Sequence, residues 1–307
     1  MAKGNMLLGM SRGSVGDVTF YRSGGSQRAR ARNRKPANPM TVRQQTQRAK
    51  FANAVKFHKQ VTSNFFRFAY EDKKVNESDY NAFMRHNVGN SGFIGAKASK
   101  IASWPALGLW EVTNGSLPEI NVSTPQTGYR FDCDLNISAT YTTVGALSAA
   151  LIAHGDTWRE GDILTVLMYR ATAAATLPTV DTETEHTASS AYIQIVLNSA
   201  DTTTLESIVG NCGGVEFMMI ADEADGFNIS GVGEDFPEVW NSDLLQCAVI
   251  HSRNTAGGLL VSTQSMVANK PQVITDALNE GGTYYNAVLA DWDAAAEAVL
   301  QGGAAAN

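Results

Sequence analysis

Arginine residues occupy every second position of the stretch SQRARARNRK at residues 26–35, namely Arg28, Arg30, Arg32 and Arg34. A guanidinium group is always charged in proteins and donates paired hydrogen bonds to phosphate or carboxylate oxygens. Side chains two positions apart share a face of a β-strand, whereas on a helix they would be spread around much of the circumference. The spacing therefore predicts a strand with one cationic face that binds anions.

The residues before this stretch supply a partner strand. The segment VTFY at 18–21 is strand-like, and SGGS provides the glycines that a tight turn needs. A turn centred on Gly24-Gly25 predicts a β-hairpin with two different faces. Its anion-binding face pairs Tyr21, Thr19 and Asp17 with Arg28, Arg30 and Arg32, and its packing face pairs Phe20 and Val18 with Ala29 and Ala31.

We expect this basic region to bind its partner through Tyr21, Arg28, Arg30, Arg32, Arg34, Lys35 and Arg48. The arginines would hold phosphates or carboxylates, and the Tyr21 ring would stack on a base or a guanidinium. The residues alone do not distinguish between two partners. One is a nucleic acid (DNA or RNA), and the other is an acidic surface of the protein itself.

Charge is divided very unevenly along the chain. Residues 1–100 hold 19 Lys and Arg against 5 Asp and Glu, a net +14, and residues 101–307 hold 5 against 25, a net −20. This asymmetry indicates a basic module joined to an acidic one. If the basic module binds the acidic part of a neighbouring copy, the chain forms a head-to-tail homo-oligomer.

Other patterns point away from catalysis. The five histidines are scattered, and neither a zinc-protease motif nor a GxSxG motif occurs. GMSRGSVGD lacks the GK[ST] ending of a phosphate loop, so its glycines are interpreted as turn glycines. DEADG and TVDTETEH lack calcium-loop spacing and are interpreted as solvated loops. The sequence predicts a non-enzymatic protein without metal or cofactor.

The predicted elements define an α+β fold: an N-terminal basic β-hairpin plus long helix, then an antiparallel β-sandwich and a C-terminal helix. The long helix is expected over about 42–69, with Phe51, Val55, His58 and Phe65 on one side, and a shorter one near 78–87 with Ser78 as its cap. Strands are expected at 129–141, 162–170, 190–198, 215–227, 244–254 and 257–267, with an exposed loop at 170–190 and a helix at 284–300.

These elements predict four segments: a basic hairpin-helix assembly or nucleic-acid module at 1–87, a connector at 88–118, the acidic β-sandwich at 119–268, and a C-terminal helix and tail at 269–307. Trp104 and Trp110 indicate that the connector packs against the rest of the protein, because an exposed tryptophan is unfavourable. The sequence predicts neither a signal peptide nor contact with a membrane. Three widely spaced cysteines favour folding in a reducing compartment.

The N-terminal region resembles a recurrent pattern of phage- and Bacteroidetes-associated proteins of unknown function, over roughly residues 4–70. The pattern is a Gly-x-Val-Gly opening, a strand ending in Arg-x-Arg, Asn-Pro-x-Thr-x-x-Gln, and a helix with Arg-x-x-Phe. The matching residues are Gly13, Val15, Gly16, Arg30, Arg32, Asn38, Pro39, Thr41, Gln44 or Gln45, Arg48 and Phe51. Proteins with this pattern look like virion or phage-encoded structural components, and the resemblance carries no biochemical role.

Together these observations predict a phage or phage-like virion structural protein, a capsid, sheath or filament subunit that self-assembles. Its basic N-terminal surface would face nucleic acid or an acidic neighbouring subunit. Its expected location is the virion, and the cytoplasm of the infected bacterium during assembly. The alternative is a carbohydrate- or surface-binding β-sandwich module.

Overall fold

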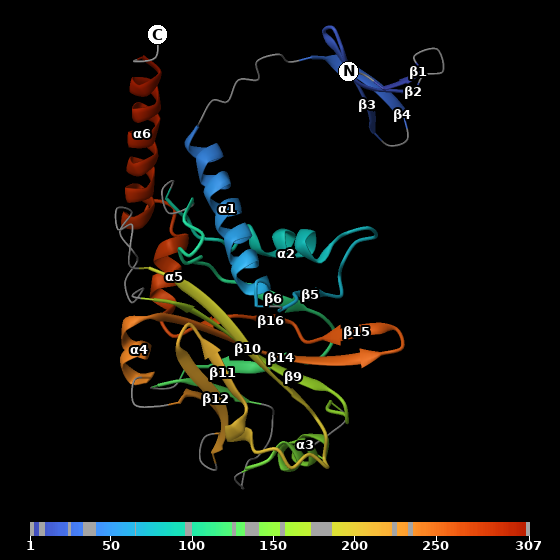
Figure 1. Cartoon of the computed structure of the whole chain (residues 1–307), viewed down its shortest axis with the longest axis vertical. Helices are drawn as coiled ribbons and strands as arrows, with labels where there is room; N and C mark the ends of the chain where they lie inside the picture. The colour runs from blue at the N-terminus through green and yellow to red at the C-terminus, as the bar shows by residue number, and fades with distance from the viewer. Residues whose placement is uncertain are drawn as a thin grey trace. The chain divides into compact units, whose positions relative to one another are not determined.

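A computed structural model describes residues 3–5, 10–23, 26–32, 41–64, 66–95, 100–124, 127–132, 141–153, 157–172, 186–222, 226–232 and 236–304. The chain forms two compact units, residues 1–41 and residues 42–307. Figure 1 shows the elements of both. The long helix that the sequence analysis grouped with the hairpin begins at the unit boundary and belongs to the second unit.

The first unit is a four-stranded antiparallel sheet in the order β1-β2-β3-β4. Its strands are β1 (Lys3–Asn5), β2 (Met10–Val15), β3 (Val18–Ser23) and β4 (Ser26–Ala31). Strands β3 and β4 are the predicted hairpin, and their register is the predicted one. Strands β1 and β2 were not predicted from the sequence. Gly16, at φ 57°, forms the β2–β3 turn in a left-handed conformation that glycine adopts without strain.

A central antiparallel sheet organises the second unit, in the order β10-β9-β14-β15 with β17 also paired to β14. Its strands are β9 (Ile163–Ala171), β10 (Ala188–Val196), β14 (Leu244–Thr255), β15 (Gly258–Val261) and β17 (Val267–Ala268). Strands β9 and β14 are buried on both faces, which explains why they read as nearly continuous apolar runs rather than as alternating ones.

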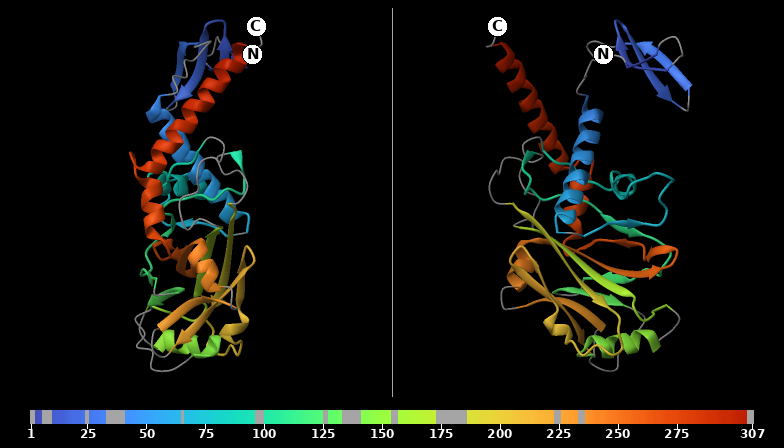
Figure 2. Two further views of the ribbon diagram at one scale, coloured as in Figure 1. Left: turned by 90° about the vertical axis from the view of Figure 1, so that its left-hand side faces the viewer. Right: turned by 45° about the vertical axis from the view of Figure 1, so that its right-hand side comes forward.

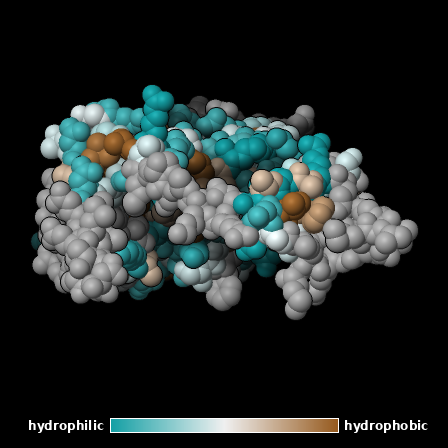
Figure 3. All heavy atoms as spheres, turned by 90° about the horizontal axis from the view of Figure 1, so that it is seen from above, coloured by the Kyte–Doolittle hydropathy of each residue, from teal (hydrophilic) through white to brown (hydrophobic). Residues whose placement is uncertain are grey.

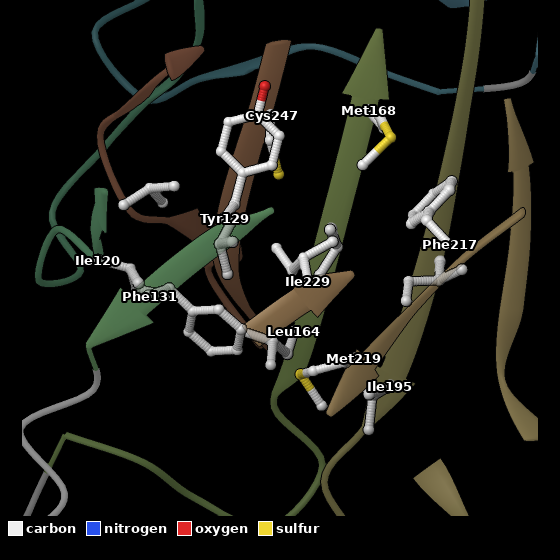
Figure 4. Close-up of a cluster of buried hydrophobic side chains, with 14 of the residues drawn as sticks. Ile120, Tyr129, Phe131, Leu164, Met168, Ile195, Phe217, Met219, Ile229 and Cys247 are labelled. Atoms are coloured by element: carbon white, nitrogen blue, oxygen red, sulfur yellow. The ribbon is translucent and has the colours of Figure 1, made fainter. Parts of the chain in front are cut away.

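A second antiparallel sheet, in the order β11-β12-β13-β8-β7, packs against one face of the central sheet. Its strands are β7 (Asn121–Ser123), β8 (Tyr129–Asp132), β11 (Val209–Cys212), β12 (Val215–Asp222) and β13 (Gly226–Gly231). Side chains of both sheets meet in one buried cluster, as Figure 4 shows for Met168 and Leu164 beside Phe217, Ile229 and Phe131. The two sheets thus form the predicted antiparallel sandwich.

Helices cover the other face of the central sheet. They are α1 (Val42–Thr62) and α2 (Asp79–Asn87), next to a small sheet of β16 (Gln264–Ser265), β6 (Glu111–Asn114) and β5 (Ala69–Tyr70). Side chains of these elements share a second buried cluster with β9 and β14. The second unit therefore has three layers, and Figures 1 and 2 show α1 and β12 on opposite sides of the central sheet.

Helix α1 differs from its prediction in length and in its buried face. It ends at Thr62 rather than near residue 69, and Phe65 lies outside the described residues. Phe51 was expected on the packing side but is 49% exposed, whereas Phe57 and Val61 are fully buried. The polar residues Thr46, Asn53 and Lys56 also lie on the buried side, so the apolar periodicity of the sequence does not mark that side.

The connector at 88–118 packs as expected, and polar side chains of α1 hold it in place. Asn53 Nδ2 donates to the carbonyl oxygens of Gly92 and Leu107 at 3.1 and 2.6 Å. Lys56 Nζ donates to Ile101 O at 2.7 Å. Trp104 and Trp110 are buried. Buried backbone carbonyl groups need hydrogen-bond donors. In this irregular segment the side chains of α1 supply the hydrogen bonds that a neighbouring strand would supply in a sheet.

Several other predicted elements are present. Ser78 caps α2 by accepting from Asn81 N at 3.2 Å, and β14 and β15 form a hairpin next to Gly257-Gly258. The C-terminal helix is α6 (Thr283–Ala304). The sequence analysis missed helices α3 (Val144–Ala153), α4 (Phe236–Ser242) and α5 (Pro271–Leu278). Most of the predicted 170–190 loop and the end of the predicted 129–141 strand lie outside the described residues.

Candidate cationic interface of the N-terminal sheet

The register of the N-terminal sheet gathers its basic residues on one face. Tyr21 pairs with Arg28 and Thr19 with Arg30, so these four residues share a face. Arg32 continues the same alternation, and its backbone N donates to Asp17 O at 2.6 Å. These residues form the face that the sequence predicted to bind anions, and we call it the cationic face.

Contacts within the cationic face fix two of its side chains. The Arg30 guanidinium carbon lies 5.6 Å from the centroid of the Tyr21 ring, a diagonal cross-strand contact. An exposed contact of this kind contributes about 0.5–1 kcal/mol. Ser14 and Thr19 hydroxyls are 2.9 Å apart and join β2 to β3 on the same face. The face therefore presents a guanidinium that is already oriented by an aromatic ring.

Both faces of this sheet are exposed in the single chain. Arg28, Arg30 and Arg32 are exposed, and Tyr21 is 38% exposed. On the face predicted to pack, Val18 is also 38% exposed, and Ala29 and Ala31 are exposed. The sequence of the first unit holds eight Lys and Arg against one Asp, a net +7, while residues 42–307 carry −13.

Three predicted binding residues remain. Arg34 and Lys35 lie outside the described residues. Arg48 is exposed on α1, in the second unit. The prediction therefore divides into a β-sheet surface with four described residues, Tyr21, Arg28, Arg30 and Arg32, and a separate position on a helix.

Sequence reasoning missed two basic positions in β1 and β2. Lys3 pairs with Arg12, and Ser14, two residues after Arg12, pairs with Thr19 of β3. The alternation of Arg12 and Ser14 with Ser11 and Gly13 was the available signal. Because the segment GMSRGSVGD contains three glycines, it was interpreted as a turn, although Gly13 lies within strand β2.

The second unit contains a buried histidine–aspartate pair. Such pairs also occur in catalytic sites, but this one is enclosed by other side chains. His251 Nε2 lies 2.8 Å from Asp162 Oδ2, and Arg253 donates to both carboxylate oxygens at 2.7 and 2.6 Å. His251 is fully buried under the Trp158 ring, with centroids 4.0 Å apart. Burial lowers the pKa of His251 despite Asp162, so the imidazole is neutral.

The charge on Asp162 is held by its partners. Burial alone would raise the pKa of Asp162, but hydrogen bonds from Arg253 and His251 bring it below the ordinary value. The described residues leave no opening through which a substrate would reach His251, since its side chain is 1% exposed. The cluster thus ties β9 and β14 together at the start of β9.

The described residues also include two cysteines and several separate acidic groups. Cys212 and Cys247 are free and buried, and burial raises the pKa of the Cys212 thiol to about 12. Within the described part of the chain, no group of three or more His, Cys, Asp or Glu residues is arranged to hold a metal ion. None of the helices found there combines the length and apolarity that crossing a bilayer requires.

No curated protein and no solved structure matches the chain. One family model does match, over residues 10–205, which run from β2 in the first unit to the short 3-10 helix that precedes β11 in the second. The match covers most of the chain and agrees with the expected membership of an uncharacterised family, while the association with phages stays a prediction. The chain belongs to DUF6266, a family of unknown function.

Proposed function

We propose that this protein is a non-enzymatic structural subunit that self-assembles, and that the cationic face of its N-terminal sheet binds an acidic partner. The observation that carries the proposal is the register that brings Tyr21, Arg28 and Arg30 onto one exposed face. The N-terminal resemblance favours a virion or a phage-like particle as the assembly, with the cytoplasm of the infected bacterium as the place where it forms.

The acidic partner favoured by the charges is another copy of the chain. Residues 171–252 contain 13 Asp and Glu and not one Lys or Arg. Opposite charges on two parts of one chain steer copies together head to tail. A closed ring or an open filament then results, depending on whether the rotation between copies closes.

Nucleic acid is the second candidate partner, and the Tyr21–Arg30 contact favours it. An aromatic ring beside guanidinium groups offers one surface for a base and another for a phosphate. Such binding would weaken steeply with salt, because each neutralised phosphate releases counterions.

One set of variants separates these partners. The change Arg28→Gln, Arg30→Gln, Arg32→Gln removes three charges from the cationic face. The control Arg22→Gln removes one charge from a position of β3 that pairs with Gln27 rather than with an arginine. If nucleic acid is the partner, the triple change lowers the slope of log affinity against log salt for a labelled oligonucleotide by about 2–3. If a neighbouring copy is the partner, the triple change dissolves the assemblies in electron micrographs and leaves oligonucleotide binding unaltered.

Arg22→Gln should have little effect in either assay. The proposal fails if the triple variant assembles and binds like the wild type. The carbohydrate- or surface-binding alternative predicts instead a positive glycan screen that the triple change does not alter.

A further inference from the structure

The exposed side of α1 carries an aromatic ring between two cations. Phe51 is 49% exposed and Val55 is half-buried beside it on the helix. Arg48 and Lys59 flank them at helical spacing and are exposed. This α1 stripe (Arg48, Phe51, Val55 and Lys59) runs along the side of α1 opposite Phe57 and Val61, and Val55 also packs in part against their buried cluster.

A solvated Phe ring in mid-helix is unusual because its burial would contribute about 2 kcal/mol or more. Exposed hydrophobic residues with a charged rim are typical of protein interfaces, in which aromatic residues and arginine are enriched. Figure 3 shows small hydrophobic patches among hydrophilic residues on one face of the protein. The composition of the α1 stripe therefore indicates a protein partner with apolar and acidic groups.

The outer face of the second sheet has the complementary composition. Val209 pairs with Met218 on this face; Val209 is 42% exposed, and Met218 and Ile220 are half-buried. Glu216 stands beside them on β12, and Glu206 precedes β11 on the short 3-10 helix; both are exposed. Among the described residues neither glutamate has an ion-pair partner, in keeping with the absence of Lys and Arg from 171–252.

The two surfaces lie on opposite sides of the second unit. Helix α1 belongs to the layer on one face of the central sheet, and β11 and β12 belong to the layer on the other face (Figures 1 and 2). Residues 42–100 carry 11 Lys and Arg against 4 Asp and Glu, whereas residues 205–222, which include β11 and β12, hold three acidic residues and no Lys or Arg. One copy cannot bring these surfaces together, because its own core separates them.

We propose that copies of this chain join head to tail through the second unit, with the α1 stripe of one copy seated on the outer face of β11 and β12 of the next. Phe51 and Val55 contact Val209 and Met218 across the interface. Arg48 and Lys59 meet Glu216 and Glu206. The inference rests on the proposed self-assembly but uses a contact distinct from the cationic face of the N-terminal sheet.

Two variants of the full chain test the interface from its two sides. The helix variant is Phe51→Ser with Lys59→Glu, and the sheet variant is Val209→Lys with Glu216→Lys; all four positions are exposed. Matched controls reverse an exposed charge elsewhere on the second unit, Arg67→Glu for the helix variant and Glu119→Lys for the sheet variant. Sedimentation velocity over a wide concentration range measures the mass of each species, and circular dichroism confirms folding.

Because the proposed assembly needs this contact as well as that of the cationic face, each variant should lose all species heavier than the 32.9 kDa chain, while both controls assemble like the wild type. An equimolar mixture of the helix and sheet variants then forms a species of two chains and nothing larger, since each variant keeps one intact surface. High salt shifts that species toward single chains.

The inference is overturned if the mixture stays monomeric, if either variant assembles like the wild type, or if the wild type never assembles. The proposed function has a separate readout in Arg28→Gln, Arg30→Gln, Arg32→Gln. Assemblies lost in that triple variant but kept in the helix and sheet variants would sustain the proposed function and refute this interface.

Discussion

The ring of Phe57 stacks on the indole of Trp110, with ring centroids 4.4 Å apart and planes inclined by 11°. Phe57 comes from α1 and Trp110 from the end of the connector, and both are fully buried. Phe83 of α2 lies beside both rings, with its centroid 6.2 Å from that of Phe57 and 6.5 Å from that of Trp110. The contact joins helix, connector and central sheet in one cluster.

Two phenylalanines of one helix should therefore respond differently to truncation. Phe57→Ala leaves a cavity in the cluster and should lower the free energy of unfolding by about 3–5 kcal/mol. Phe51→Ala, at an exposed position, should change it by less than about 0.5 kcal/mol. Urea unfolding followed by circular dichroism measures both, and similar losses for the two variants would contradict the assignment of the buried face.

Asn53 should be among the least replaceable polar residues of α1. Its amide donates to Ser91, Gly92 and Leu107, and its Oδ1 accepts from Leu107 N at 3.2 Å. Asn53→Ala leaves these buried groups unpaired and should cost about 3 kcal/mol in thermal or urea unfolding. Gln47→Ala, at an exposed position of the same helix, is the control. An unaltered stability of the Asn53 variant would show that the connector does not depend on it.

Asp162 should stabilise the fold in a pH-dependent way. Its pKa is lowered in the folded protein, so its contribution is complete above the unfolded value of about 3.9 and is lost as the pH falls through the folded value. Asp162→Asn leaves Arg253 without its carboxylate and should cost about 3 kcal/mol at neutral pH. The difference from wild type should shrink in acid, and a difference that stays constant down to pH 2 would rule out this linkage.

Lys56 should act in the opposite range of pH. Burial lowers its pKa to about 8, while the unfolded chain keeps a lysine pKa of about 10.4. Between these values the unfolded state binds more protons, so stability rises with pH. Relative to Lys56→Met, the wild type should gain about 1–2 kcal/mol from pH 7 to pH 10, allowing for solvent screening. Parallel stability curves for the two proteins would contradict it.

The buried thiols should be inert in the native protein. Burial raises the pKa of both Cys212 and Cys247, so almost no thiolate forms at pH 8. In a Cys133→Ser chain, a disulfide reagent should modify neither residue until denaturant is added. Rapid modification of either thiol would place it at a surface.

The hairpin of the first unit was predictable because its information is local. Alternation decides which side chains share a face, and the two glycines decide where the turn falls; together they fix the pairing of Tyr21 with Arg28 and of Phe20 with Ala29. The strands β9 and β14 were predictable for a similar reason, since long apolar runs of β-branched and aliphatic residues have few alternatives to a buried strand.

The buried side of α1 depended on residues far away in the sequence. Asn53 and Lys56 look like solvent-facing residues until the carbonyls of Gly92, Leu107 and Ile101 are brought to them. A polar side chain can be buried where the folded chain supplies its hydrogen-bond partner. The spacing of residues along the helix does not show which distant residue that partner is.

The sequence by itself determined the cationic face of the first unit and the alternation that builds it, because a β-strand sorts its side chains with a period of two. Only the tertiary structure decided that Phe51 faces solvent while Phe57 is buried, and that the basic helical layer and the acidic outer sheet lie on opposite sides of one core. The physical reason is that distant residues decide which side of a helix is buried. They must hydrogen-bond its polar side chains and pack against its apolar ones at the same time.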